Sequence, residues 1–500
     1  MASLGDSVGL GKRIQNIDEL VSHGNMTGRK AILEILETGL QAADPYNNTR
    51  KLIRLQGDTL IVGGREFEPS GSPITGEEVY DLSDINRIFV LGAGKGIQRV
   101  AKAIEDTLGD RLTGGHVIDK KGSAVILKKI GVTLGAHPLP DEDCVRGCER
   151  IRKLTAGLTE NDLVFTCVSN GVSSLLTMPA PGVSIEDLRK AAYTTQIELG
   201  SQTRGLYLIR NQVDMMKGGR ISRLIQPAKA IHIIAIEPGS YDQLMHRNGW
   251  LHTLPDENTT YERALKNLKE WNTWDNLPES IKKFLETSDP KYAPVRSDEF
   301  EKWTFRIFGV MPGFNQSAKL PPAIKKAREL GFNPVILSDD MMQVEAAPAG
   351  RYMANITRTI ERTGKPFEPP CAIFSSGEMI VTVGQEKGIG GRSQEYTLSA
   401  ALRIAGSKRV VMASVDTDGT DGPGVQFTNG PEGMPPCFAG GVVDGYTVGE
   451  AEKAGVENVL AELRKHNTSP VLWKAKSAVV ARQGISLNDL TVALVMGHSR

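Results

Sequence analysis

Short apolar segments alternate with amphipathic helical segments along most of this 500-residue chain, and this alternation limits the fold more than any other feature. Arg87–Leu91 is an apolar run, and Ile97–Leu108 after it carries apolar residues at helical spacing. The same order returns at Arg306–Val310 and Pro321–Leu330. Strands that alternate with helices usually pair in parallel, with helices on both faces of the sheet. We therefore expect an α/β fold of two domains with mainly parallel sheets.

The alternation is interrupted once, by a segment rich in Asn, Glu, Lys and Trp with few apolar runs. We interpret residues 257–305 as a helical insertion or connector, which would serve as a dimer arm or as a lid. A larger, Rossmann-like N-terminal domain is then expected over residues 25–256 and a smaller C-terminal domain over residues 306–497. Ligands of open α/β sheets bind beyond the carboxyl ends of the strands. The active site is therefore expected in the cleft between the domains.

Charge and composition exclude several classes of protein. The 59 Lys and Arg residues balance 59 Asp and Glu residues, so the formal net charge is zero. Nucleic-acid and membrane-surface proteins need a clustered basic excess, so neither partner is expected, although a few local cations suffice for a small anionic substrate. No apolar run approaches the ~18 residues of a spanning helix. The first twelve residues lack a secretory pattern and the five Cys are sparse, so we expect a cytoplasmic protein.

Two glycine-containing loops of the expected N-terminal domain carry groups that suit an anion. Gly94 and Lys95 lie in a Gly-Ala-Gly-Lys-Gly loop after a strand, where backbone N–H groups and the lysine charge can bind phosphate. The second loop offers hydroxyl and amide groups at Ser169-Asn170-Gly171 and at Ser173. A tight strand-to-helix turn and a helix N-cap are the structural alternatives for these two loops.

A third loop is cationic. It contains Lys217-Gly218-Gly219-Arg220 and is preceded by Arg210, and such cations suit a carboxylate or a phosphate. A helix C-terminus is the alternative interpretation of Lys-Gly-Gly.

Two further loops follow strands of the expected C-terminal domain. In the first, Gly390, Gly391 and Arg392 precede Glu395 at the start of a helix, where glycines, a helix N-terminus and a guanidinium favour an anion. The second, Asp416–Pro423, holds three carboxylates within six residues, which suit Mg²⁺ or a general base. An Asp- and Gly-rich turn is the alternative.

Taken in order, these loops resemble the glycerate 2-kinase family with its C-terminal MOFRL domain. The resemblance covers about residues 25–255 and 305–497. The matching positions are Gly92–Lys95, His137-Pro138, Pro140-Asp141, Ser169, Gly171, Ser173, Arg210, Lys217–Arg220, Pro255-Asp256, Gly377-Glu378, Gly390–Arg392, Gln394-Glu395, Asp418-Gly419 and Asp421–Pro423.

The resemblance implies transfer of the γ-phosphate of ATP, with Mg²⁺, to the 2-hydroxyl of a small hydroxy acid. The family's catalytic Lys and Arg correspond to Lys95 and Arg392. We expect Asp418 or Asp421 to hold Mg²⁺ or to accept the hydroxyl proton, with Asp418 catalytic. Substrate and phosphate contacts are expected from Gly94, Ser169, Asn170, Gly171, Ser173, Arg210, Lys217, Gly390, Gly391 and Glu395.

The chain departs from the family pattern in the first domain. A Ser-Asp pair of the family is replaced by Ala235-Ile236, and its Ser-Gly-Pro-Thr loop is replaced near Gly249–Thr253. These departures keep two alternatives open. The first is a repurposed fold that acts on an anionic hydroxy or oxo acid as an isomerase, hydrolase or lyase. The second is an NAD(P)-linked reductase, for which Asp119 after the next strand would be the acidic residue.

Overall fold

The computed structural model describes residues 11–137, 139–195, 203–236, 239–270, 272–311, 319–426, 429–485 and 487–497. The chain divides into two compact units. The first unit is Pro45–Pro312, and the second unit combines Met1–Asp44 with Gly313–Arg500. Within the described part of the chain, none of the helices combines the length and the apolarity that a membrane crossing requires.

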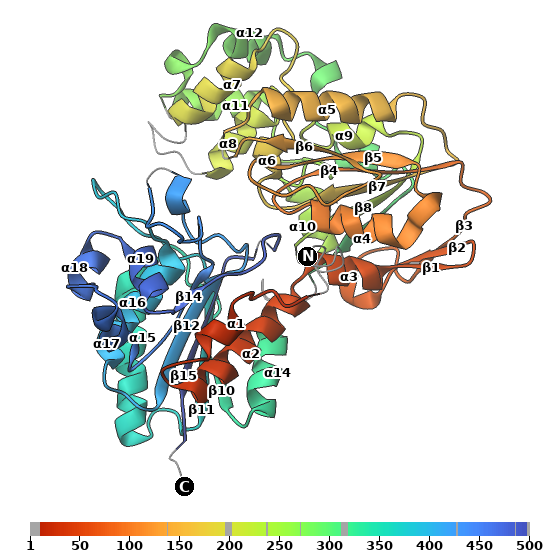
Figure 1. The fold of residues 1–500 in the computed structure, drawn as a ribbon. Coiled ribbons are helices and arrows are strands. Elements are labelled where there is room, and N and C mark those ends of the chain that lie inside the picture. Colours follow the sequence, from red (N-terminus) through yellow and green to blue (C-terminus); the bar gives the residue numbers. More distant parts are fainter. Residues whose placement is uncertain are drawn as a thin grey trace. The chain divides into compact units, whose positions relative to one another are not determined.

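Six parallel strands form the main sheet of the first unit, in the order β6-β5-β4-β7-β8-β9 (Figure 1). Their bounds are β4 (Arg87–Ala93), β5 (Gly114–Lys120), β6 (Gly131–Gly135), β7 (Asp162–Val168), β8 (Lys229–Ile234) and β9 (Phe305–Gly309). Numbered within this sheet, the order is 3-2-1-4-5-6, that of a doubly wound Rossmann fold. The strand order therefore reverses between β4 and β7, and the predicted parallel sheet is confirmed for this unit.

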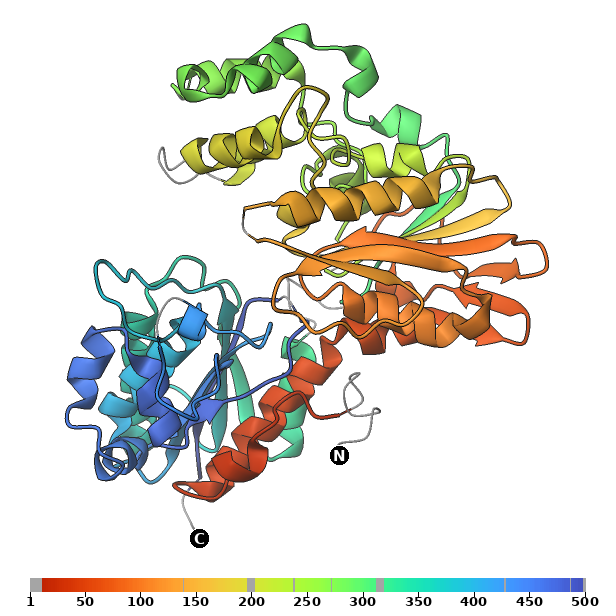
Figure 2. The ribbon, with the colours of Figure 1, turned by 45° about the horizontal axis from the view of Figure 1, so that its top comes forward.

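Helices cover both faces of this sheet, which is why every residue of β7 is buried. Figure 2 shows α5 (Glu142–Thr155) on one face and α4 (Gln98–Leu108) on the other. A small antiparallel sheet lies against α4, made of β1 (Ile53–Gln56), β2 (Thr59–Val62) and β3 (Glu78–Asp81). The other α-helices up to β8 and just after it are α3 (Pro45–Leu52), α6 (Val172–Leu175), α7 (Ile185–Tyr193), α8 (Thr203–Arg210), α9 (Arg220–Leu224) and α10 (Tyr241–His246).

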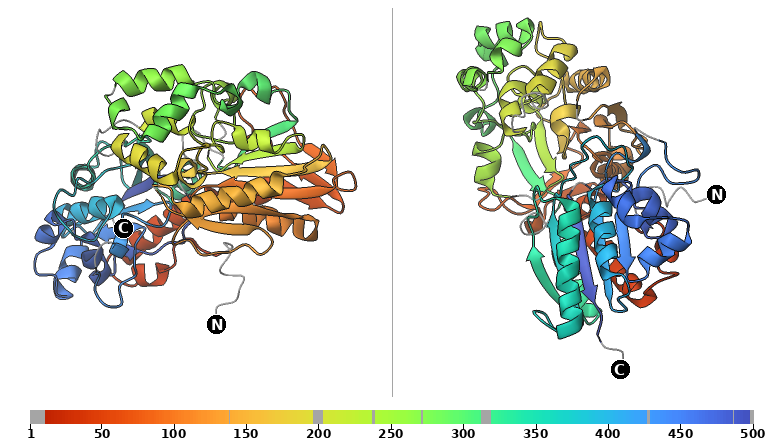
Figure 3. Two further views of the ribbon diagram at one scale, coloured as in Figure 1. Left: turned by 90° about the horizontal axis from the view of Figure 1, so that it is seen from above. Right: turned by 90° about the vertical axis from the view of Figure 1, so that its left-hand side faces the viewer.

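The segment 257–305 is helical, as predicted, but it belongs to the first unit and does not connect two domains. It contains α11 (Tyr261–Glu270), α12 (Glu279–Thr287) and α13 (Ser297–Phe300). Leu268 and Ile281 pack with Leu188 of α7 in one apolar cluster, and Figure 3 shows these green and yellow helices side by side. The strand expected at 306–310 to open the C-terminal domain is β9, which pairs with β8 instead.

The sheet of the second unit is mixed, in the order β10-β11-β15-β12-β13-β14. Its strands are β10 (Asn333–Ser338), β11 (Cys371–Gly377), β12 (Val410–Asp416), β13 (Gly440–Asp444), β14 (Ala478–Val479) and β15 (Asp489–Val495). Among the described strand pairs of this sheet, β10 and β11 alone run parallel. The expectation of a mainly parallel second sheet is therefore wrong: the last strand inserts antiparallel between β11 and β12, and β13 and β14 also pair antiparallel.

Two helical layers enclose the second sheet (Figures 1 and 3). One face carries α2 (Met26–Ala42) and α14 (Leu320–Glu329). The other face carries α15 (Ala346–Thr363) and α16 (Arg392–Ile404), with α17 (Thr447–Lys453), α18 (Val459–Arg464) and α19 (Thr468–Lys474) beyond them. The short α1 (Ile17–Leu20) precedes α2.

The N-terminal segment is part of the second unit, so the expected domain start at residue 25 is wrong. Arg29 of α2 is completely buried and its Nε lies 2.6 Å from Oδ2 of Asp444, at the end of β13. The same guanidinium donates to the hydroxyls of Thr447 (3.1 Å) and Ser477 (3.0 Å). A buried ion pair between residues more than 400 positions apart leaves no local sequence signal, which explains why the boundary was misplaced.

Replacement of Arg29 by Met should therefore destabilise the second unit. The change leaves the Asp444 carboxylate buried without its cation, and we expect the free energy of unfolding to fall by about 3–5 kcal/mol. Denaturant titration measures this loss. Arg247→Met is the control, because Arg247 and Asp242 form an exposed pair worth less than about 1 kcal/mol. Equal effects of the two substitutions would contradict this account of residues 11–44.

Candidate functional site

The loops after β4 and β7 interlock at the point where the strand order of the first unit reverses. The backbone N–H of Lys95 donates to the carbonyl of Asn170 (2.8 Å), and the Ser169 hydroxyl donates to the carbonyl of Lys95 (2.9 Å). Gly94 has a φ of +143°, and a Cβ at this position would collide with Ser169. The sequence predicted that these residues lie together, and the structure brings them together.

Lys95 lies half-buried at this edge beside Gly171. Gly171 has a φ of +82°, and a Cβ there would lie 3.0 Å from the Lys95 side chain and 3.1 Å from the His137 ring. His137 belongs to the predicted His-Pro segment, whose Pro138 lies outside the described residues. The glycines therefore allow two loops to pack closely, and this packing holds the lysine at the carboxyl edge of the sheet.

Asp119, the acidic residue of the reductase alternative, is engaged within the protein. It is 1% exposed, and its carboxylate accepts hydrogen bonds from the backbone of Gly96 (3.0 Å) and the side chain of Gln98 (3.0 Å). Its carboxylate thus fixes the glycine loop from beneath. The reductase alternative needed Asp119 to bind the ribose of the dinucleotide, and these bonds use its carboxylate instead.

Ser173 contacts a histidine that sequence reasoning missed. Its Oγ lies 2.8 Å from Nε2 of His252, which is 1% exposed. Burial, together with the positive charge of Lys217 nearby, lowers the pKa of His252 well below its usual range, so the ring is neutral. The one available signal was position, because His252 lies in the Gly249–Thr253 segment where the chain departs from the family pattern.

The other ring nitrogen of His252, Nδ1, is buried without a hydrogen-bond partner among the described residues. A buried N–H group without an acceptor is rarer than an unpaired lone pair. The neutral ring therefore carries its proton on Nε2 and donates it to Ser173 Oγ. The hydroxyl proton of half-buried Ser173 is then not needed for His252 and has no acceptor among the described residues.

The two predicted carboxylate-binding cations differ. Lys217 is 1% exposed, and its ammonium donates to the Leu176 carbonyl (2.7 Å) and the Thr177 hydroxyl (2.8 Å) and pairs with Asp214. Its three N–H groups are thus used inside the protein, where a substrate carboxylate was expected as their partner.

Arg210 remains a candidate for that role. It ends α8, and burial lowers its pKa to about 10. Among the described residues, its guanidinium forms no hydrogen bond or ion pair, although Asp214 and Tyr207 act on it through charge. Arg210 is therefore a half-buried cation whose N–H donors are not used by the described residues.

In the second unit, the strand register gathers carboxylates at one edge of the sheet. Asp489 opens β15 and pairs in register with Gly377 at the end of β11 and with Asp416 at the end of β12. Glu378 follows β11 directly. Sequence reasoning did not place Asp489 or Glu378 in the site, although Glu378 lies at a position that matches the family pattern.

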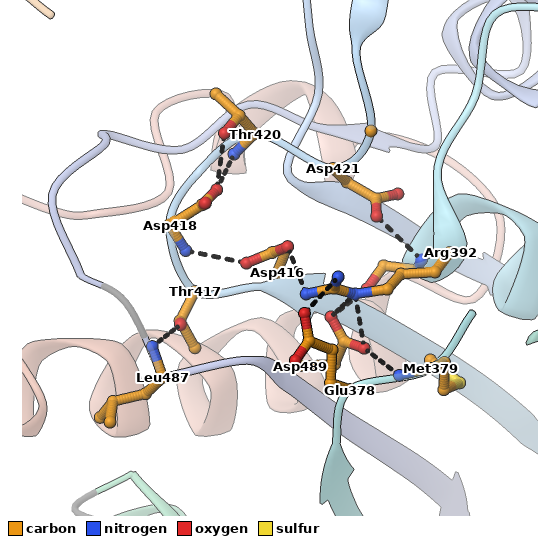
Figure 4. A network of polar contacts seen from close by, with 12 residues as sticks. Glu378, Met379, Arg392, Asp416, Thr417, Asp418, Thr420, Asp421, Leu487 and Asp489 are labelled. Carbon is orange, nitrogen blue, oxygen red and sulfur yellow. Dashed lines mark hydrogen bonds and ion pairs between the residues drawn. The ribbon is translucent and has the colours of Figure 1, made fainter. Parts of the chain in front are cut away.

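Arg392 of α16 fills the centre of this cluster (Figure 4). Its Nε donates to both oxygens of Asp489 (2.8 and 2.9 Å) and its Nη2 to Asp416 (2.8 Å). The Nη1 contact with half-exposed Glu378 is longer, at 3.3 Å. Burial alone would lower the pKa of Arg392, but the carboxylates raise it, so the guanidinium stays charged.

Acidic groups outnumber cations in this cluster. Burial raises the pKa of Asp416 well above its usual range, and the neighbouring charge of Asp418 raises it further. Lys319 is the second cation: its ammonium is buried, donates to the Leu487 carbonyl and has a pKa lowered by burial to about 8. The acidic members are Glu378, Asp416, Asp418, Asp421 and Asp489, against Arg392 and Lys319.

Asp421 caps α16 and does not face a ligand. Its two oxygens accept hydrogen bonds from the backbone N–H groups of Ser393 (3.0 Å) and Gln394 (2.8 Å). A Cβ at Gly391 would collide with Asp421, so this glycine makes room for the cap. The helix N-terminus therefore already binds an anion, which belongs to the protein. The structure thus gives Asp421 a capping role where metal binding was expected, and Gly391 the role of making room for that cap.

The remaining predicted residues of this unit also have contacts within the protein. Asp418 is half-buried, and its Oδ1 accepts hydrogen bonds from the N–H (2.8 Å) and hydroxyl (2.6 Å) of Thr420. Glu395 is buried against His466 and bonded to its Nδ1, and a Cβ at Gly390 would collide with Thr468. Within the described residues, no group of three or more His, Cys, Asp or Glu side chains is arranged to hold a metal by itself.

Comparisons with known proteins agree with this architecture. A family described as a domain of unknown function (DUF4147) matches residues 31–286, and the MOFRL family matches residues 371–490. The chain is 29% identical over 472 residues to the glycerate 2-kinase of Pyrococcus horikoshii, which covers 93% of this chain and 97% of that protein. It is 30% identical over 424 residues to the D-glycerate 2-kinase of Thermotoga maritima, with 84% and 93% covered.

A solved structure shares the fold. The crystal structure of a glycerate kinase from Thermotoga maritima matches with a TM-score of 0.71 and 27% identity, over 94% of this chain and all of that one.

The buried cap Asp421 predicts a pH dependence of stability. Burial, and then the charge of Asp489, raises its pKa from 3.8 to about 7. Between pH 4 and 7 the folded state therefore keeps a proton on Asp421 that the unfolded state has released. The stabilisation that this proton gives is complete below pH 4 and is lost as the pH rises to 7. Relative to Asp421→Asn, the natural protein should lose up to roughly 4 kcal/mol over that interval and stay level above it.

Denaturant unfolding at a series of pH values measures this slope, the change in the free energy of unfolding per pH unit. Asp444→Asn is the matched control, because Arg29 holds the pKa of Asp444 below its usual value despite burial, so its slope has the opposite sign. The same slope for both substitutions would contradict the role given to Asp421.

Proposed function

Because this chain belongs to the glycerate 2-kinase family and is a kinase, we propose that it transfers the γ-phosphoryl group of ATP, with Mg²⁺, to a hydroxyl of a small hydroxy acid similar to glycerate. Phosphoryl transfer to a hydroxy acid follows from the family, whereas the donor, the metal and the acid are the proposal. The observation that carries it is the edge of the first unit, where Lys95 lies beside the hydroxyl loop at the reversal of strand order.

The acid is proposed to bind at the same edge. Ser173 presents a hydroxyl proton oriented by His252, and Arg210 presents a cation whose donors the described residues leave unused. A carboxylate beside a hydroxyl needs this combination of a guanidinium and a neutral donor. Arg210 would thus bind the carboxylate and Ser173 a neighbouring oxygen of the substrate.

Two cations are proposed to neutralise the transferring group, because charge on the equatorial oxygens dominates the barrier to phosphoryl transfer. Lys95 would do so from the first unit. Arg392 would use its Nη1 edge, where the 3.3 Å contact with Glu378 is the weakest of its ion pairs. Its Nε and Nη2 atoms remain held by Asp489 and Asp416, which fix the plane of the guanidinium.

The acidic cluster fits Mg²⁺ by its chemistry. Mg²⁺ prefers oxygen ligands and usually takes one or two carboxylates plus substrate phosphates. Asp418 and the adjacent Asp416 supply such oxygens. After burial, the charge of Asp418 is the next cause that raises the pKa of Asp416, so a cation beside the two carboxylates would be stabilising. The ion would contribute charge neutralisation on the phosphates. Asp418 is half-buried, so it is also the carboxylate that we propose accepts a proton from a substrate hydroxyl.

Lys95→Met should lower kcat/KM by about 10²–10³-fold, since it removes one cation from the transferring group. Release of ADP from ATP and Mg²⁺ with a panel of sugar acids measures it. Lys153→Met, at an exposed position on α5, should leave the rate unchanged. Absence of turnover with every acid and of ATP binding by calorimetry would contradict the proposal and favour a repurposed family fold.

His252→Leu should raise KM for the acid about tenfold and leave kcat unchanged, because it removes the donor that orients Ser173. His252→Gln, which keeps an N–H at this position, should restore KM, and the effect should not vary between pH 6 and 8. His116→Leu is the control, because His116 forms a similar buried pair with Thr133 (2.8 Å) and should reduce stability alone. A KM effect that Gln does not rescue would mean a structural role.

A further inference from the structure

A cavity of about 860 Å³ lies entirely within the second unit, beside Arg392. One side is formed by the segment around and after the end of β11, and the other by the loops before α16 and after Asp421. Its size falls within the range of sites that hold a ligand of several rings, about 300–1,000 Å³. A three-carbon hydroxy acid would fill only a small part of it.

One wall of this cavity is apolar and accessible. Met342, Ile380 and Val383 all line it and are 42%, 40% and 41% exposed. Large apolar side chains of this kind are normally buried, and three around one cavity form a surface that an apolar ligand can cover. A small charged acid has no surface with which to cover them.

The opposite wall has a different chemistry. Gly388, Gly390 and Gly391 line this wall with backbone, because their Cβ positions face the protein interior. The bonded pair of Glu395 and His466 lines the cavity and offers polar edges within it. Arg392 also lines the cavity, with the carboxylates of the cluster around it. The cavity thus suits a ligand with a planar apolar body, a few polar atoms and an anionic group.

We infer that this cavity binds the base and ribose of the nucleotide, with the phosphates directed toward Arg392. This inference rests on the proposed function, since it places the donor of that reaction. A purine ring would lie against the apolar wall, where the Met342 sulfur makes favourable contacts with aromatic rings. The polar edges of Glu395 and His466 would face its ring nitrogens and amino group.

The inference is tested by comparing ATP with tripolyphosphate, which carries the same phosphates without base or ribose. Calorimetry with Mg²⁺ measures both affinities in the full-length protein. The natural protein should bind ATP at least tenfold more tightly than tripolyphosphate. Ile380→Asn should weaken ATP binding about tenfold and leave tripolyphosphate binding unchanged, because it alters the apolar wall alone.

Ile336→Asn is the matched control, because Ile336 is 51% exposed on β10 and does not line the cavity. Both substitutions are at accessible positions, and equal melting temperatures would establish that each variant is folded. As a second measurement, irradiation of the protein methyl groups should transfer magnetisation to the purine protons in the natural protein and less in Ile380→Asn.

Three results would overturn the inference. ATP turnover with equal affinities for ATP and tripolyphosphate would place the base elsewhere, while the proposed function would stand. Equal losses of ATP and tripolyphosphate affinity in Ile380→Asn would mean a general disturbance of the Arg392 region. Absence of binding by either compound, together with absence of turnover, would overturn both the inference and the proposed function.

Discussion

The insertion of β15 between β11 and β12 is the constraint on which the second unit depends. The register of β15 places Asp489 beside the ends of β11 and β12. Glu378, which follows β11, and Asp416, which ends β12, therefore lie at the same edge of the sheet as Asp489. Buried carboxylates this close repel one another unless a cation lies among them. Arg392 supplies that cation, and removal of one partner from such a buried network costs several kcal/mol. The position of α16, which carries Arg392, is therefore coupled to the pairing of the last strand.

The same helix is fixed a second time at its first turn. Asp421 accepts the N–H groups of Ser393 and Gln394, and Gly391 provides the space for that approach. In the first unit, Asp119 likewise bonds to the glycine loop after β4. Glycine loops and helix N-termini favour anions in both units, but part of that preference is satisfied by the chain's own carboxylates. A glycine-rich loop is thus evidence of close approach, and the partner can be internal.

The sequence predicted best what is determined locally. The strand at Arg87–Leu91 appears as β4 and the helix after it as α4, because buried parallel strands are continuously apolar and covering helices are amphipathic. The strand order and loop contents then placed Lys95 next to Ser169 correctly. What failed depends on pairing across long distances: the packing of α2 on the second sheet, the assignment of β9, and the direction of β15. Such pairings carry no periodic signal in either partner.

The roles of side chains likewise depend on long-range contacts that the sequence pattern does not show. Lys217 and Asp421 have the residue types of ligands, but tertiary contacts with Asp214 and with α16 assign them to the interior. His252 was missed for the converse reason: a single histidine in an apolar loop has no motif, and its importance comes from Ser173, which is 79 positions away. Residue type and spacing therefore identify the chemistry that a loop can offer, and burial decides which side chains offer it to a ligand.

The charge balance of the whole chain is neutral, yet its two candidate ligand edges are not. Near Ser173 and His252, the cations Arg210, Lys217 and Arg220 outnumber Asp214. The described residues use the donors of Lys217 and Arg220 but not those of Arg210. Around Arg392, five carboxylates face two cations, and burial already raises the pKa of Asp416 and Asp421. A triphosphate that approached this second edge alone would add negative charge to a negative cluster. The same triphosphate bound to a dication would instead relieve this repulsion, and this is the electrostatic reason for proposing a metal-bound phosphoryl donor.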